Sequence, residues 1–436
     1  MMCRAAAMGC LLLTIAACGG EPQTQPQTAG NIDLTSAAQY FEEFETLCNG
    51  DDGKLWGVSF CGPILLVDPS TRTAVANRAD AGGVLAPRLG LFAGELPAEV
   101  GIANTATEWS GGRWTMIMWW SLSDDPKRRL RLMAHEAFHR IQPELNLAPF
   151  GEINAHLDTA DGRFWIQMEW NALQKALSVE GVARREALID AMTFRASRRA
   201  LFPNAAERET PLEIFEGLAE YSGMRLAGYS DAGVVEAVTA KREGETGLVR
   251  SFAYVSGPLY GFLLDGSGVS WRDRIGPDTD LGALVAELLD VSAASTDEAS
   301  MRAEAYGGQA LLSAESERER KRKQQLAAWR TSLIDGPVLI VDLTAVSSGT
   351  FDPGRVFPFD ETRTVYTTRG LIGDWGVLTV SDGAILEDDT GGRAYVSLNG
   401  AAPDMLEGQG WILELNDGWT IVAAERPGDF FVRRGD

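Results

Sequence analysis

The chain has 436 residues, of which 45% are hydrophobic and 23% are charged. That balance is typical of a globular protein and excludes a disordered chain, a collagen-like fibre and a coiled coil. With 61 acidic residues against 39 basic ones, the formal net charge is −22. Such an acidic surface disfavours nucleic acid as a partner, because binding phosphate requires basic patches.

The N-terminal stretch MMCRAAAMGCLLLTIAAC has the pattern of a signal sequence. A single early base, Arg4, precedes an apolar run that is too short to span a membrane as a mature helix. The segment ends in IAAC, which resembles the lipobox of bacterial lipoproteins. This resemblance implies that residues 1–17 are removed and that Cys18 carries lipid; the alternative is an ordinary secretory signal cleaved nearby. Gly19 follows without an aspartate, so we expect a lipid anchor as the chain's only membrane attachment, in the outer membrane of a bacterial envelope and facing the periplasm.

The next segment, residues 18–33, is rich in Pro, Gln, Thr and Gly and predicts a flexible tether. Two further cysteines, Cys48 and Cys61, remain once the signal is removed and Cys18 is lipidated. An even pair in an oxidising compartment predicts a disulfide between them.

The folded part is expected to begin with strands and to continue with helices, in a domain of residues 34–335. Residues 55–78 are typical of strands joined by a turn at 68–70, and residues 113–122 of another strand. A helix is expected from about residue 125 until just before Pro143, with Pro126 in its first turn. Further helical patterns cover residues 163–200, 211–228, 254–266 and 313–329.

The composition changes after the segment Asp335-Gly336-Pro337. From there, short apolar runs alternate with turn signals such as those at 352–354 and 416–418. Residues 336–436 are therefore expected to form a small antiparallel β domain, and the whole chain is expected to be α+β.

Two of the chain's three histidines, His135 and His139, lie four residues apart around Glu136. On a helix, residues four apart share a face, so both imidazoles can bind one cation while Glu136 stays beside it. This is the H-E-x-x-H pattern, in which zinc activates a water molecule and the glutamate takes its proton. The alternative is a buried amphipathic helix whose two histidines are satisfied by hydrogen bonds.

A third ligand decides the kind of site, because catalytic zinc usually has three protein ligands and one open position. The extension H-x-x-G-x-x-H is absent, since Gln142 and Leu145 stand where Gly and His are needed. His156 is a candidate by residue type alone. Glu216 and Glu220 are better candidates, because they lie four apart in an apolar helical frame; an exposed acidic helix face is the alternative.

With these two segments the sequence resembles the gluzincin metallopeptidases, the thermolysin-like clan. The resemblance implies a thermolysin-like zincin domain, with an N-terminal β-sheet followed by a mainly helical part. It also implies one zinc ion, bound by His135, His139 and Glu216. Glu220 would accept the other ring N–H of one histidine. Two departures are Phe215, where the family usually has Asn, and the long interval between the two segments.

The same resemblance implies a catalytic tyrosine and a strand that binds substrate. Tyr254 fits the position of a donor to the oxyanion better than Tyr260, although tyrosines in apolar helices are usually core residues. In this family an edge strand just before the motif helix holds the substrate, and residues 115–122 occupy that position.

The expected function is that of a zinc-dependent peptidase acting on a peptide or protein and tethered to the cell envelope. The alternative is a non-catalytic metal-binding lipoprotein that binds or assembles partners. Its structural zinc would need a fourth ligand, for which His156 is the candidate. A third possibility, an esterase or amidase, would share the metal chemistry. No G-x-S-x-G element is present, which disfavours a serine hydrolase.

Overall fold

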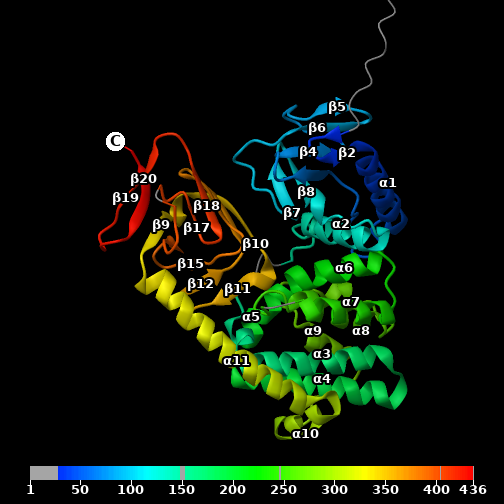
Figure 1. Cartoon of the computed structure of the whole chain (residues 1–436). Coiled ribbons are helices and arrows are strands. Elements are labelled where there is room, and N and C mark those ends of the chain that lie inside the picture. The colour runs from blue at the N-terminus through cyan, green and yellow to red at the C-terminus, as the bar shows by residue number, and fades with distance from the viewer. Residues whose placement is uncertain (1–27, 148–152, 245–246, 403, 436) are drawn as a thin grey trace, which may run out of the picture.

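The computed structural model describes residues 28–147, 153–244, 247–402 and 404–435. The expected signal sequence and Cys18 lie outside the described residues. Helices and antiparallel strands occupy separate regions of the chain, so the fold is α+β with C-terminal antiparallel sheet, as the sequence predicts (Figure 1). Within the described ranges, no helix combines the length and apolar character needed to cross a membrane.

Residues 28–33, within the expected tether, are part of the folded structure. Strands β1 (Thr28–Ala29) and β2 (Ile32–Asp33) form a short hairpin, in which Ile32 is fully buried. Asp33 then caps helix α1 (Leu34–Asp51) by accepting a hydrogen bond from the Ser36 backbone N–H at 2.7 Å. A segment with buried apolar residues is not a free linker, so residues 28–33 belong to the fold. Near the end of α1, Cys48 forms a disulfide with Cys61.

A six-stranded sheet follows, in the order β5-β6-β4-β3-β8-β7. Strands β3 and β8 are parallel, and the other described pairs of this sheet are antiparallel. Along β3, Ile64 and Leu66 face the helical core, and Leu65 and Val67 face the opposite core, so the strand is apolar throughout. The strands are β3 (Ile64–Asp68), β4 (Thr73–Ala76), β5 (Ala86–Arg88), β6 (Leu91–Glu95), β7 (Thr105–Trp109) and β8 (Gly112–Met118).

The prediction that residues 115–122 form the edge strand is wrong. Strand β8 pairs with β3 on one side and β7 on the other, and it ends at Met118. Its buried residues Trp114, Met116 and Ile117 suit an interior position. The edge is β7, whose sequence TATEW is more polar, as edge strands usually are.

Helix α2 (Pro126–Ile141) packs against this sheet and begins as the sequence predicts. The Asp125 side chain accepts a hydrogen bond from the Arg128 backbone N–H at 2.9 Å, and Pro126 occupies the first turn. The expected helix over 163–200 is two helices, because the chain is extended at Val179 and Glu180. The helical layer below α2 contains α3 (Ala160–Ser178), α4 (Gly181–Leu201), α5 (Ala205–Leu212), α6 (Leu218–Leu226), α7 (Asp231–Gly244), α8 (Ala253–Asp265), α9 (Leu281–Leu288) and α10 (Ala299–Ala303).

Helix α11 (Gly308–Arg330) leads from this layer to the C-terminal strands (Figure 1). These strands form two sheets with their own core, which includes Leu339, Trp375 and Trp411. The sheet orders are β10-β13-β14-β18-β17 and β11-β12-β15-β16-β9-β20-β19, and among the described pairs only β20 and β9 are parallel. The strands are β9 (Val338–Asp342), β10 (Val346–Phe351), β11 (Val356–Pro358), β12 (Arg363–Tyr366), β13 (Arg369–Gly373), β14 (Gly376–Val380), β15 (Ile385–Asp388), β16 (Arg393–Ser397), β17 (Glu407–Gly408), β18 (Trp411–Leu415), β19 (Trp419–Ala423) and β20 (Phe430–Arg434).

Candidate metal centre

The two histidines of α2 point their imidazoles at one position. His135 Nε2 and His139 Nε2 lie 3.1 Å apart, and both rings are buried. With Glu136, also buried, they form a group whose possible ligand atoms lie within 4.8 Å of one another. The helix therefore presents a buried group that can hold a metal ion.

Glu216 brings a third ligand atom to the same position. Its Oε2 lies 3.6 Å from His135 Nε2 and 3.4 Å from His139 Nε2. Four-coordinate zinc with ligand distances of about 2.1 Å would separate its ligand atoms by about 3.4 Å. The spacing of the three atoms therefore fits one zinc ion. Glu216 Oε2 and Glu136 Oε2 are both buried without a well-formed hydrogen bond. A buried carboxylate oxygen needs a partner, and a bound cation would provide one.

A π-helical turn and close helix packing place Glu216. The turn, Glu213–Gly217, lies between α5 and α6, and such turns are frequent at functional sites. A Cβ added to Gly257 of α8 would lie 2.2 Å from the Gly217 Cα, and one added to Gly223 of α6 would lie 2.5 Å from the Arg131 carbonyl oxygen. The glycines thus let the Glu216 segment approach both α8 and α2.

Gly257→Ala is expected to push α8 away from the π-helical turn. We expect a loss of about 1–3 kcal/mol in the free energy of unfolding, together with weaker metal binding. Urea unfolding of the metal-free protein and a zinc titration measure the two effects. Gly244→Ala on α7 is the control, because nothing lies within 4 Å of its added Cβ. Equal stability of the two variants would contradict the packing argument.

Each imidazole is oriented by a hydrogen bond at its other nitrogen. His135 Nδ1 lies 2.9 Å from Glu220 Oε2, and Glu220 in turn pairs with Arg131. His139 Nδ1 lies 2.8 Å from Gln142 Oε1, while Gln142 Nε2 donates to the Phe215 carbonyl oxygen at 2.9 Å. Both Nε2 atoms are thereby directed at the ligand position.

Glu220 therefore lies where the resemblance places it, but sequence reasoning missed two of these residues. The motif search singles out Gln142 only as a residue that breaks a longer motif, and it does not single out Arg131. Helical spacing was the available signal, because Arg131 lies four residues before His135 and Gln142 three residues after His139.

Gln142→Ala is expected to weaken metal binding, measured with zinc, by about 10- to 100-fold, because it frees the His139 ring to rotate. Competition with a chromogenic chelator measures the change. Gln167→Ala on α3 is the control, since that side chain bonds to Glu315 and to the Arg163 backbone. An unchanged zinc affinity in Gln142→Ala would show that the hydrogen bond does not orient the ligand.

The charges around the imidazoles favour a cation. Burial alone would lower the pKa of His135, but Glu216 and Glu220 outweigh it and raise that pKa to about 10. Burial opposes ionisation of Glu216, yet the two histidines hold its pKa well below the usual range. Burial raises the pKa of Glu136, although both histidines oppose the change. The carboxylates thus stabilise positive charge at this position.

Tyr254 lies at the centre, and Tyr260 does not. The Tyr254 ring stacks on His135 with centroids 5.5 Å apart and planes 4° apart. Burial and the charge of Glu216, with which the hydroxyl interacts, raise the pKa of Tyr254. The Tyr260 hydroxyl instead donates to Glu169 Oε1 at 2.5 Å, within a buried ion network.

His156 belongs to that network as well. Its Nε2 lies 2.8 Å from Glu209 Oε1, and Glu209 also accepts from Arg198 and Arg199. The structure therefore does not bring His156 to the paired imidazoles.

The C-terminal strands reach the surroundings of the metal centre through Arg250. This side chain is buried, and its positive charge acts on Glu216. Its guanidinium carbon lies 5.5 Å from the ring centroid of Phe351 on β10. Nearby, the Gly247 backbone N–H donates to the Gly354 carbonyl oxygen at 3.0 Å.

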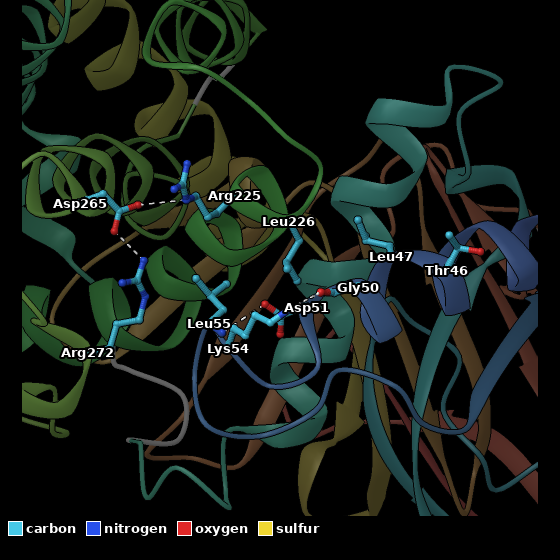
Figure 2. A pocket seen from close by; sticks show the side chains of 10 residues that line it. All are labelled: Thr46, Leu47, Gly50, Asp51, Lys54, Leu55, Arg225, Leu226, Asp265 and Arg272. Atoms are coloured by element: carbon cyan, nitrogen blue, oxygen red, sulfur yellow. Dashed lines mark hydrogen bonds and ion pairs between the residues drawn. The ribbon is translucent and has the colours of Figure 1, made fainter.

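A cavity of about 750 Å³ lies beside the end of α6, where Arg225 and Leu226 line it (Figure 2). It is lined by the end of α1 and by Asp265, which pairs with Arg225 and Arg272. Tyr221 follows Glu220 in sequence, but its hydroxyl donates to Asp265 at 2.9 Å and not to a group of the metal centre. None of the described residues that line this cavity belongs to the metal centre. Asp265 is already paired with two arginines, so it does not indicate a catalytic or metal site.

Two imidazoles, one carboxylate and an adjacent buried carboxylate suit the hydrolysis of a carbonyl compound by an activated water molecule. His135, Glu136 and His139 form the group that could hold a metal ion, and Glu216 Oε2 lies within 3.6 Å of both imidazole Nε2 atoms. No model of a protein family, no curated protein and no solved structure matches this chain.

Proposed function

We propose that this chain is a zinc-dependent peptidase with a thermolysin-like catalytic part. The convergence of His135 Nε2, His139 Nε2 and Glu216 Oε2, at separations of 3.1–3.6 Å, carries the proposal. Nitrogen and carboxylate donors of this kind favour zinc, whereas calcium and magnesium take oxygen donors. The order of a sheet followed by helices, with α2 and α6 packed together, also supports the thermolysin-like assignment.

A bound zinc ion would supply Lewis acidity toward a water molecule and the scissile carbonyl group. Glu136 accepts the proton of the attacking water and passes it to the leaving amine, a role that suits a buried carboxylate with a raised pKa. The Tyr254 hydroxyl, beside Glu216 and the His135 ring, donates to the oxygen that becomes negatively charged. Glu220 and Gln142 keep the two imidazoles in place.

A polypeptide substrate is supported by the free edge of β7, which can pair with an extended chain. This edge lies close to the end of α2, because Arg113 donates to both elements. One guanidinium nitrogen donates to Glu108 on β7 at 3.0 Å, and the other to the His139 carbonyl oxygen at 3.3 Å. Arg113 thus fixes the position of β7 relative to α2, the helix that carries Glu136.

The test is metal content and cleavage in the full-length protein. We expect about one zinc ion per chain and cleavage of casein or unstructured peptides. A chelator should abolish cleavage, and added zinc should restore it, because no other group at the centre replaces the Lewis acid. A protein that binds zinc but cleaves no peptide, or cleaves equally well without metal, would contradict the proposal.

The alternative of a structural zinc in a binding lipoprotein loses its expected fourth ligand, because His156 is bonded to Glu209. We further propose that the enzyme acts at the bacterial envelope, held by lipid on Cys18. The disulfide between Cys48 and Cys61 supports an oxidising compartment.

A further inference from the structure

Two strand edges from different sheets line one cavity. Strand β7 is the edge of the N-terminal sheet, and β10 is the edge of the five-stranded C-terminal sheet. A cavity of about 540 Å³ lies between them, with Thr105 and Thr107 on one wall and Ser347 and Thr350 on the other. Figure 1 shows β10 on the side of the C-terminal strands that is nearest to β7.

The two walls touch at one point, and the β10 wall ends beside Arg250. Before β7, a Cβ added to Gly101 would lie 2.9 Å from the Ser348 Cβ, so the walls touch at this point. On the C-terminal side, β10 ends at Phe351, which packs against Arg250. Arg250 in turn interacts electrostatically with Glu216. The end of β10 therefore packs on a residue whose charge is felt at the metal centre.

The residues that line this cavity suit an extended chain. Strand edges offer backbone N–H and C=O groups that pair with an added strand. Most of the residues of β7 and β10 that line the cavity have a small side chain or none, which leaves room for a main chain. They are Thr105, Thr107, Ser347, Ser348, Gly349 and Thr350.

The charged residues that line the cavity determine which extended chains bind most favourably. The described residues that line it include two acids, Glu99 and Glu108, and no base. Both acids are exposed. Glu108 is paired with Arg113 at 3.0 Å, so the negative charge that meets an incoming ligand comes mainly from Glu99. Basic side chains are therefore favoured and acidic ones repelled.

We propose that β10 is the second wall of the substrate site, and that the slot between β7 and β10 holds an extended polypeptide segment carrying basic side chains. The inference depends on the proposed peptidase function for its purpose, but it makes a separate claim about binding. The C-terminal strands thereby take part in substrate selection.

The test measures binding without cleavage. Full-length, zinc-loaded protein carrying Glu136→Gln is titrated into fluorescently labelled decapeptides, one rich in lysine and one rich in glutamate, and anisotropy is recorded. Ser347, exposed on β10, is changed to Lys or to Asp in this background. Glu407→Gln on β17, the opposite edge of the same sheet, changes the net charge by as much as Ser347→Lys and is the control.

The basic peptide should bind more tightly than the acidic one. Ser347→Lys should weaken binding of the basic peptide by about fivefold and Ser347→Asp should strengthen it by about threefold, while the control stays within about twofold. Methylating alternate backbone nitrogens of the peptide should weaken binding by about tenfold, because it removes strand pairing.

Failure of the basic peptide to bind, equal binding of both peptides, or identical behaviour of the Ser347 variants and the control would overturn the proposal. Failure of the peptidase function would appear elsewhere, as absence of cleavage by the zinc-loaded protein with Glu136 intact. The two failures are therefore distinguishable.

Discussion

Glu136→Gln is expected to keep its zinc and to lose peptide cleavage by about 10²- to 10⁴-fold, the usual contribution of a general base. The amide has the size of the carboxylate, so the histidines on either side keep their positions on α2. It cannot accept the proton of the attacking water, however. The loss should appear in kcat rather than in KM, because Glu136 interacts with the water and not with the peptide.

Metal content and steady-state kinetics of the same preparation measure the two effects. Glu144→Gln is the matched control, because Glu144 is exposed just beyond the end of α2. That variant should match the wild type in both measurements. Cleavage by Glu136→Gln within tenfold of the wild-type rate would remove Glu136 from the mechanism and require another base.

The sequence predicts the paired imidazoles because helical geometry is local. Residues four apart share a face whatever surrounds the helix, so the alignment of His135 and His139 needs only the helix itself. The caps and breaks of α2 are equally local, since Asp125, Pro126 and Pro143 act on their immediate neighbours. The burial of Glu216 followed from the apolar residues around it in the same way.

The sequence predicts contacts between distant segments less well than it predicts local structure. Whether β8 or β7 is the edge depends on the pairing of β8 with β3, some fifty residues earlier in the chain, which no local pattern encodes. The slot between β7 and β10 depends in the same way on how the C-terminal strands pack. The family resemblance suggested Glu216 as a ligand, whereas its position beside the imidazoles depends on the contact between Gly217 and Gly257.

Glu216→Ala is expected to weaken zinc binding by more than about 100-fold, beyond the effect of losing an orienting hydrogen bond. Removal of its carboxylate leaves two imidazoles, which hold zinc much less tightly than three ligands do. Wild-type protein with free zinc at 100 times its Kd gains about 2.7 kcal/mol in the free energy of unfolding, and the variant should gain almost none at the same zinc concentration.

Urea unfolding with and without zinc measures this difference, and it does so without any assay of cleavage. Glu207→Ala on α5, an exposed glutamate nine residues earlier, should respond to zinc as the wild type does. Glu216→Asp should recover part of the zinc response, because it restores the carboxylate on a shorter side chain. If Glu216→Ala instead binds and responds to zinc normally, the third ligand lies elsewhere. The thermolysin-like assignment then fails even if peptides are cleaved, since it requires a ligand from the helical segment that leads into α6.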